Sequence, residues 1–285
     1  MTPVSYTSSR HVQGKDYCVS ASSSMADAIA KGFLSARRAA QGLADYPGTV
    51  PDTLTEAYAI QDAALARVED RVAGWKVGRI LPPLSDQYGS DRLAGPILAR
   101  TVAAIESHSR GLVFADGFGA IEAEFLFRIG KTPPAEMTHF TLEEAADHVD
   151  AVHIGVEIAS SPFVGINAMG PAVTVSDFGN NNGLLIGPAV PDWTSGAYAE
   201  QSVTTRIDGT EVGTGAASAF SHGALGSVRF LLENLASRGI AIQSGWWVST
   251  GAVTGVHPVR PGQEVEMDFG PLGTLHCRID AQEPR

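Results

Sequence analysis

The segment GAIEAEFLFRIG, residues 119–130, carries the strongest signal for both the fold and the chemistry of this chain. Glu122 and Glu124 stand two positions apart among Ile, Phe and Leu. In a β-strand both carboxylates leave from the same face, because side chains alternate across a strand. Two neighbouring anions in an apolar strand repel each other and lose hydration. The pattern indicates either a site for a hard divalent cation or an edge strand whose glutamates face water.

Two further apolar segments hold charged residues of the same kind. AVHIGVEIAS, residues 151–160, is strand-like and contains Glu157, which is a candidate for a third oxygen ligand. GWKVG, residues 74–78, places Lys76 between Trp75 and Val77. Burial there would lower the pKa of the lysine and make it a candidate for proton transfer. The alternative is an ordinary strand lysine that faces solvent.

The rest of the chain divides into a helical beginning and a β-rich remainder. The periodicity predicts helices over 25–44, 53–72, 141–149 and 223–238, two of them with capping boxes at Thr53 and Thr141, and a loop over 81–96. Asp208-Gly209 is a hairpin signal. Short strand-like runs recur at 111–114, 121–129, 151–159, 172–175, 183–187, 203–208, 211–213, 246–249, 264–269 and 274–279. We therefore expect an α+β protein, rich in β structure, with a rolled mixed sheet and an N-terminal helical lobe.

The composition narrows the class of protein. The chain has 285 residues, of which 44% are hydrophobic and 18% charged, as in a globular protein with a sizeable core. The net charge of −11, without a block of Lys or Arg, argues against partners among nucleic acids and anionic membranes. Two cysteines, Cys18 and Cys277, favour a reducing, cytoplasmic location over a disulfide framework. No apolar run is long enough to span a bilayer.

The first 24 residues are polar and rich in serine, and they lack the apolar core of a secretory signal. We expect residues 1–24 to be a disordered leader or a tag. Residues 25–98 would then form the N-terminal helical lobe with the lysine-bearing strand, and residues 99–285 the catalytic β domain.

Other residues are weaker candidates, each with a plain alternative. Asp177, next to the polar turn of residues 179–183, either caps that turn or, with a neighbouring asparagine, orients a metal ligand. Thr250 and Gly251 offer a hydroxyl and an uncluttered amide for a substrate carboxylate, or simply end a strand. His222 precedes a helix and lies either near the site or on the surface. The sequence contains no zinc-helix histidine pair, no G-x-S-x-G elbow and no dinucleotide-binding glycine pattern.

Taken in order, seven segments resemble the fumarylacetoacetase-like superfamily, and within it the branch of 2-keto-4-pentenoate hydratases and 4-oxalocrotonate decarboxylases. The resemblance runs from about residue 50 to residue 280. It rests on LTEAYAIQDA, GWKVG, IEAEFLFRIG, VHIGVEIASS, VSDFGNNNGLLIG, HGALGSVRFLLENLASRG and SGWWVSTGAVTGVHPVRPGQEVEMDFGPLGTL. It implies the rolled mixed β-sheet of that superfamily, behind an N-terminal helical part.

The resemblance also assigns roles to residues. It implies that Glu122, Glu124 and Glu157 hold Mg²⁺ (or Mn²⁺), that Lys76 lies near the substrate, and that the Thr250-Gly251 pair binds the substrate carboxylate. One departure concerns the loop YGSDRLAGPI, residues 88–97, where Ala94 stands before Gly95 and branch members often have an acid. The proton-transfer partner of Lys76 is therefore left between Asp91 and Asp177.

The implied activity is a divalent-metal-dependent hydratase of aromatic-compound catabolism. It would add water to a 2-hydroxy-2,4-dienoate through a metal-bound enolate, with small 2-oxo or 2-hydroxydienoic acids as substrates. A 4-oxalocrotonate-type decarboxylase and an acylpyruvate C–C hydrolase are the alternatives within the superfamily, and a non-catalytic member of the fold is a further one. The resemblance also implies a homo-oligomer.

Overall fold

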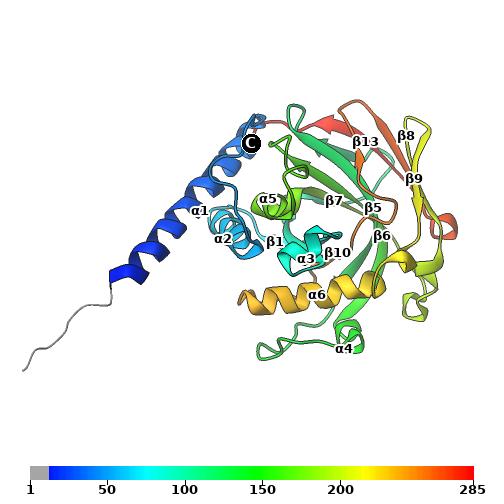
Figure 1. The fold of residues 1–285 in the computed structure, drawn as a ribbon. Helices are drawn as coiled ribbons and strands as arrows, with labels where there is room; N and C mark the ends of the chain where they lie inside the picture. The colour runs from blue at the N-terminus through cyan, green and yellow to red at the C-terminus, as the bar shows by residue number, and fades with distance from the viewer. Residues whose placement is uncertain (1–12) are drawn as a thin grey trace, which may run out of the picture.

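The computed structural model describes residues 13–285, and their side chains from residue 23 onward. Two β-sheets form the body of the molecule (Figure 1). The larger sheet has eight strands: β2 (Arg92–Leu98), β1 (Val72–Arg79), β10 (Trp247–Ser249), β5 (Phe118–Ile129), β6 (Val149–Ser161), β7 (Asn181–Ala189) and β3 (Val102–Ala104) in that order, with β11 (His257–Pro258) paired to β5.

The smaller sheet has five strands, in the order β4 (Arg110–Val113), β13 (Thr274–Ala281), β12 (Glu264–Asp268), β8 (Val203–Ile207) and β9 (Thr210–Gly215). Both sheets are mixed, with parallel pairs at β1–β10, β3–β7 and β4–β13. The larger sheet curls, so that β2 approaches β7 although four strands separate them in its order. This confirms the expected strand-rich α+β fold with a rolled mixed sheet.

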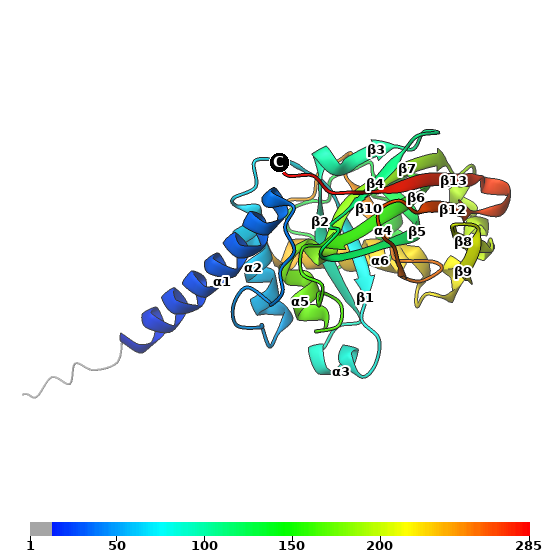
Figure 2. The ribbon, with the colours of Figure 1, turned by 90° about the horizontal axis from the view of Figure 1, so that it is seen from above.

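Helices cover one side of this body. They are α1 (Gln13–Ala39), α2 (Leu54–Leu65), α3 (Leu84–Tyr88), α4 (Leu142–Ala146), α5 (Pro171–Ser176) and α6 (Gly223–Ser237). In Figures 1 and 2, α1, α2 and α5 lie at the end of the molecule opposite β8 and β9. Buried side chains from all three helices, among them Phe33, Ile60 and Val173, belong to a cluster separate from the main core. None of the described helices is long and apolar enough to cross a membrane.

Several local predictions are confirmed, each for the physical reason that was expected. Thr141 forms a complete capping box with Glu144, and Thr53 caps α2 by accepting from the amide of Glu56, although the Glu56 side chain accepts from the amide of Asp52 and so does not close a box with Thr53. Asp208 and Gly209 join β8 to β9 with φ angles of 51° and 77°, the left-handed pair that a two-residue hairpin requires.

Two predicted segments are wrong. Residues 172–175 are helical rather than extended, because Pro171 opens α5 at a position where a proline ring is pre-shaped for a helix. Residues 81–96 are not a single loop, since they contain α3 and the first part of β2. The strand β2 pairs along the whole of β1, from Arg79 opposite Arg92 to Val72 opposite Leu98. That pairing stabilises an extended segment in spite of its proline and glycine residues.

Helix boundaries differ as well. The first helix runs from Gln13 to Ala39 instead of 25–44, and the second ends at Leu65 instead of residue 72. Residues 13–24 of the predicted leader are therefore helical, while residues 1–12 lie outside the described residues. The boundary predicted near residue 98 falls within one sheet, because β1 and β2 are continuous with β10 and β5.

Candidate metal and active site

The central pair of strands brings three glutamates together. Glu122 on β5 lies directly opposite Glu157 on β6, and Glu124 is two positions further along β5. One carboxylate oxygen from each residue lies within 4.8 Å of the other two. Their exposed fractions are 4%, 0% and 0%, which excludes the water-facing edge strand. The three glutamates therefore form a buried cluster in which one cation could contact all of them.

Burial sets the electrostatics of this cluster. Loss of hydration raises the pKa of Glu122 to about 7, although the positive charge of Lys76 opposes the shift. Burial and the neighbouring charges of Glu157 and Glu122 also raise the pKa of Glu124 well above its usual range. If all three carboxylates are ionised, they face one ammonium group, that of Lys76, and two negative charges remain uncompensated.

Two oxygens of the cluster have no hydrogen-bond partner. Oε2 of Glu124 accepts from Ser249 Oγ at 2.5 Å and from Gly251 N at 2.9 Å, but its Oε1 is buried and unpartnered. Oε1 of Glu157 accepts from Asn181 Nδ2 at 3.0 Å, whereas its Oε2 is also unpartnered. Buried carboxylate oxygens are rarely left in this state. An all-oxygen donor set with unused lone pairs and two excess negative charges fits a divalent cation such as Mg²⁺ or Mn²⁺.

Lys76 points into the same cluster. Its Nζ lies 3.2 Å from Glu157 Oε1 and donates to Asn180 Oδ1 at 3.3 Å. Burial lowers the pKa of Lys76, but the charges of the three glutamates outweigh that effect and raise the pKa above its ordinary value. The lowered pKa that we predicted for this lysine is therefore wrong for this arrangement. The residue is a charged ammonium group that can hold an anionic oxygen.

The loop that follows α5 passes very close to Lys76. Gly179, with φ of 62°, leaves only 3.1 Å between an added Cβ and Cδ of Lys76. Gly95 on β2 is packed even more tightly, since a Cβ there would lie 2.1 Å from the carbonyl oxygen of Phe178. Both glycines permit a close approach of backbone that places Asn180 beside the lysine.

The residues predicted to bind the substrate carboxylate are already engaged. Thr250 Oγ1 donates to the carbonyl oxygen of Phe125 at 2.8 Å, and the amide of Gly251 donates to Glu124. In this structure the pair therefore orients a cluster carboxylate and a neighbouring strand. His222 is exposed at the start of α6, where its Nδ1 lies 3.2 Å from Ser221 Oγ.

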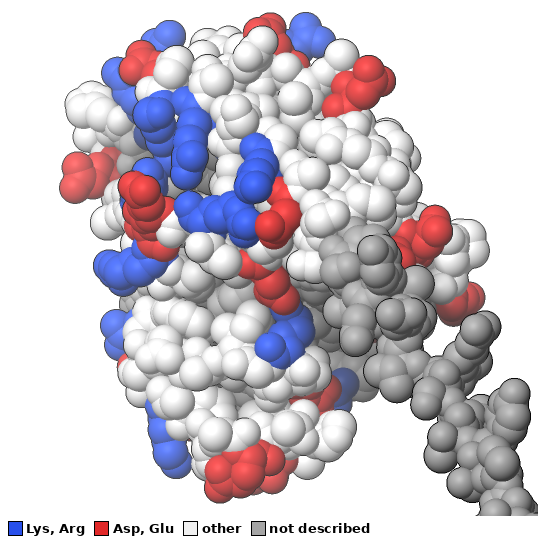
Figure 3. Space-filling model, turned by 90° about the vertical axis from the view of Figure 1, so that its left-hand side faces the viewer, with Lys and Arg blue, Asp and Glu red and all other residues white. Residues whose placement is uncertain are grey.

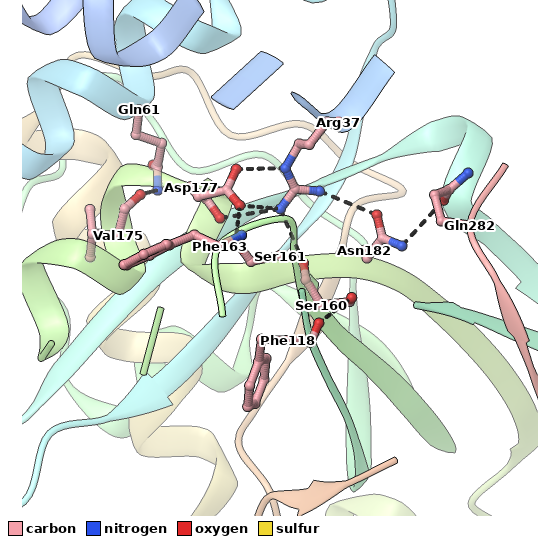
Figure 4. A network of polar contacts seen from close by, with 10 residues as sticks. All are labelled: Arg37, Gln61, Phe118, Ser160, Ser161, Phe163, Val175, Asp177, Asn182 and Gln282. Atoms are coloured by element: carbon pink, nitrogen blue, oxygen red, sulfur yellow. Dashed lines mark hydrogen bonds and ion pairs between the residues drawn. The ribbon is translucent and has the colours of Figure 1, made fainter. Parts of the chain in front are cut away.

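The structure does not bring the two predicted acids to Lys76. Asp91 is 57% exposed on its side chain and pairs with Arg92 at 2.5 Å. Asp177 is buried, but it pairs with Arg37 and accepts from Ser161 Oγ at 2.6 Å (Figure 4). Ser161 lies four residues beyond Glu157 on β6, about 13 Å along the strand. The role of these acids in proton transfer stays a prediction.

Three side chains hold the cluster, and sequence reasoning anticipated only that an asparagine next to Asp177 would reach it, without saying which one. Ser249 contacts Glu124, Asn181 contacts Glu157, and Asn180 contacts Lys76. A signal existed for the asparagines, because three in a row between two apolar runs are unusual. No local signal marked Ser249, since a serine at the end of a strand is common.

Two arginines lie side by side where β1 ends and the antiparallel strand β2 begins. Arg79 and Arg92 are directly opposed across these strands. Arg92 is buried against Asp91 and the carbonyl of Ser221, whereas Arg79 is exposed and stacks on Phe220 at 4.3 Å. Arg79 forms no ion pair with any described residue, and its charge contributes to the electrostatics of Glu122 by lowering the pKa. Opposed like charges are unfavourable unless an anion lies near them.

Comparison with known proteins gives a consistent picture. The profile of the family described as fumarylacetoacetate (FAA) hydrolase C-terminal matches residues 95–280. A 2-oxo-hept-4-ene-1,7-dioate hydratase of Escherichia coli is 27% identical over 252 residues, which cover 82% of this chain and 89% of that protein.

Solved structures agree on the fold. The 4-oxalocrotonate decarboxylase of Pseudomonas putida G7, complexed with magnesium and adipate, superposes with a TM-score of 0.75 at 22% identity, covering 90% of this chain and 97% of that one. A fumarylpyruvate hydrolase of Pseudomonas aeruginosa, in complex with Mn²⁺ and pyruvate, gives a TM-score of 0.54 at 19% identity, covering 74% and 90%. At these identities the likeness establishes the fold alone.

Proposed function

The chain belongs to the fumarylacetoacetate (FAA) hydrolase C-terminal family, and from this premise we propose that it is a divalent-metal-dependent hydratase. Its substrate would be a 2-hydroxy-2,4-dienoate, to which it adds water. The family contains enzymes of several reaction types, and the relative named as a hydratase favours this one. Mg²⁺ or Mn²⁺ is the proposed cofactor, in keeping with the ions bound in the solved structures of the decarboxylase and the fumarylpyruvate hydrolase.

One observation carries the metal part of the proposal. Glu124 Oε1 and Glu157 Oε2 are buried without a partner in a cluster that has two negative charges in excess when all three acids are ionised. A divalent cation would satisfy both deficits at once. Glu122, Glu124 and Glu157 would hold it, and when bound it would act as a Lewis acid toward the oxygens of a 2-oxo acid.

The residues around the cluster have distinct tasks in this proposal. Ser249 and the amide of Gly251 fix the orientation of Glu124, so that its free oxygen points to one place. Lys76 holds the anionic oxygen of the substrate with its ammonium group. Asn180 keeps Lys76 in position, and burial of the whole group keeps bulk water away from the charges.

We further propose that the substrate has a second carboxylate at its far end. The relative at 27% identity is named for a dioate, and one relative was solved with adipate. In this chain Arg79 supports the same class of substrate, because its guanidinium has no acidic partner among the described residues and lies opposite the buried Arg92. Arg79 would form an ion pair with the far carboxylate.

The proposal is tested with freshly prepared 2-hydroxypenta-2,4-dienoate and 2-oxohex-3-enedioate, each with Mg²⁺ and with EDTA, followed by ultraviolet absorbance and product analysis. We expect metal-dependent formation of the hydrated keto acid. Glu124→Gln should abolish it, and Glu264→Gln, on an exposed position of β12, should leave it unchanged. A hydratase whose rate is the same in EDTA would contradict the metal assignment.

The same assay, run also with an acylpyruvate, separates the alternatives. Release of CO₂ from the enedioate would assign the chain to a decarboxylase, and cleavage of an acylpyruvate to a C–C hydrolase. A non-catalytic member of the family would show neither turnover nor a rise in melting temperature with Mg²⁺ and oxalate.

A further inference from the structure

A cavity of about 510 Å³ lies apart from the glutamate cluster, at the helical end of the molecule. It is bounded by the last turns of α1, the segment before β1, the end of β2 and the C-terminal segment. Its lining residues are Leu34, Arg37, Arg38, Val68, Glu69, Pro96, Leu98, Arg100, Thr101, Phe114, Phe178, Asn181, Asn182, Gln282 and Arg285. The volume is within the range of small-molecule sites.

The charge of this cavity is opposite to that of the protein. Four of its lining residues are arginines, and one, Glu69, is acidic. Figure 3 shows basic side chains gathered on the face of the molecule where α1 ends. Arg37 and Arg100 are paired with acids outside the lining, so the positive charge that remains comes from Arg38 and Arg285. In a chain with a net charge of −11, this is a local concentration that attracts anions.

Two of the four arginines form an ion pair with an acid, and two do not. Arg37 pairs with Asp177, and Arg100 pairs with Asp70 at 2.8 Å. Arg38 contacts only a backbone carbonyl, that of Arg67, at 3.5 Å, and Arg285 donates to the side-chain oxygen of Gln282 at 3.0 Å. Neither forms an ion pair with an acid of the described residues. Burial, together with the charges of Arg100 and Arg37, lowers the pKa of Arg285.

The remaining walls are apolar. The guanidinium of Arg37 stacks between the rings of Phe114 and Phe178, at 5.6 and 5.3 Å from their centroids. Leu34 and Leu98 also line the cavity. A site with apolar walls and a few convergent cations suits a ligand with an apolar body and more than one negative charge.

We propose that this cavity binds a small organic anion that carries at least two negative charges, as carboxylate or phosphate, on an aromatic or apolar body. Arg38 and Arg285 hold the charges, and the apolar walls take the body. The site is distinct from the glutamate cluster, although Asn181 lines the cavity and also donates to Glu157. Binding here requires no metal.

The test is titration calorimetry of the full chain in EDTA at low salt, with AMP and benzene-1,3,5-tricarboxylate as probes and adenosine as the neutral control. We expect both anions to bind and adenosine not to bind. Arg38→Gln and Arg285→Gln should each weaken binding about tenfold, because each removes one charged contact. Arg260→Gln, on an exposed residue outside the cavity, is the matched control and should bind as the unaltered chain does. Raising the salt to 0.3 M should weaken binding of the anions.

The result can overturn the proposal in three ways. Absence of binding by both anions excludes the site. Equal affinity in the unaltered chain, Arg38→Gln and Arg285→Gln places the ligand elsewhere. Binding that needs Mg²⁺ and is lost in Glu124→Gln assigns the anion to the glutamate cluster instead of the cavity. A response to AMP alone or to the tricarboxylate alone supports the site and identifies whether it takes phosphate or carboxylate.

Discussion

Two buried charged centres in this protein differ in how many of their charges and polar atoms have a partner. Around Arg37 and Asp177, each carboxylate oxygen of the aspartate has a donor, and the arginine also reaches Asn182 and the carbonyl of Ser160 (Figure 4). In the cluster of Glu122, Glu124 and Glu157, three acids face one lysine, and two oxygens have no partner.

The difference separates a structural centre from a binding one. A buried ion pair whose hydrogen bonds are all made needs nothing further, and it ties α1 to the segment after α5. A buried cluster with excess charge of one sign destabilises the fold until a ligand of the opposite sign arrives. The two centres should therefore respond in different ways to mutation, pH and metal.

The largest effect should follow from breaking the complete centre. Asp177→Asn leaves the Arg37 charge buried without a counter-ion, which costs about 3–5 kcal/mol of unfolding free energy. Urea denaturation measures the change. Asp150→Asn, which breaks the exposed pair with Arg128, is the control and should cost less than about 1 kcal/mol. Similar losses for both variants would contradict the contrast between a buried and an exposed pair.

The incomplete centre should make the metal-free protein less stable as the pH rises. The folded-state pKa of Glu122 is raised from 4.5 to about 7, so the stabilisation it contributes is present below pH 4.5 and is lost as the pH rises through 7. A shift of that size corresponds to about 3 kcal/mol. The pKa of Glu124 is also raised well above its usual range, so Glu124 adds to this loss.

Denaturation in EDTA from pH 5 to 8.5 measures this slope. Glu124→Gln should flatten it, because the amide is neutral at every pH and its oxygen can still accept from Ser249 and Gly251. Glu264→Gln should leave the slope as it is. A metal-free protein that gains stability over the same range would show that the glutamates are not destabilising.

Metal should reverse the trend. Mg²⁺ at 100 times its dissociation constant should stabilise the fold by about 2.7 kcal/mol, and thermal denaturation should show a rise in melting temperature. The rise should increase from pH 5 to 8, because protons compete with the ion for Glu122 and Glu124. Glu124→Gln should lose it while Asp177→Asn retains it. An equal rise in both variants would place the ion outside the cluster.

The smallest effect concerns the rim of the site. Arg79→Gln should raise KM for a dicarboxylic substrate about tenfold, or about 1.4 kcal/mol, with kcat nearly unchanged. For 2-hydroxypenta-2,4-dienoate, which has one carboxylate, KM should not change. Arg71→Gln, on an exposed residue before β1, is the control. Equal effects on both substrates would exclude Arg79 as the contact for the second carboxylate.

Much of the cluster was predictable from local sequence. Two glutamates at i and i+2 in an apolar run predict a shared face, and the structure confirms it with Glu122 and Glu124 both buried. The capping residues Thr53 and Thr141 and the Asp208-Gly209 hairpin were predictable for the same reason, since each depends on contacts within a few residues. The order of segments was enough to indicate the family and its rolled sheet.

Other features depend on contacts between distant segments. The pKa of Lys76 is raised because Glu157, 81 positions away in the sequence, lies 3.2 Å from it, and no local pattern contains that distance. The segment 92–98 is a strand because β1 offers it a partner, and Asp177 is committed to Arg37, 140 positions earlier. Segment 172–175 was misjudged because β-branched residues favour strands until Pro171 and the packing around them favour a helix.

The sequence alone determined which charged residues stand inside apolar strands, where a charge without a partner is unfavourable. It could do so because spacing and hydrophobicity are local properties. It determined Glu122 and Glu124 as a pair, and the family to which the chain belongs. Only the tertiary structure decided which charges are paired and which are left over. Pairing depends on the register of β5 against β6 and on the approach of α1 to Asp177, and both are set by packing over the whole fold.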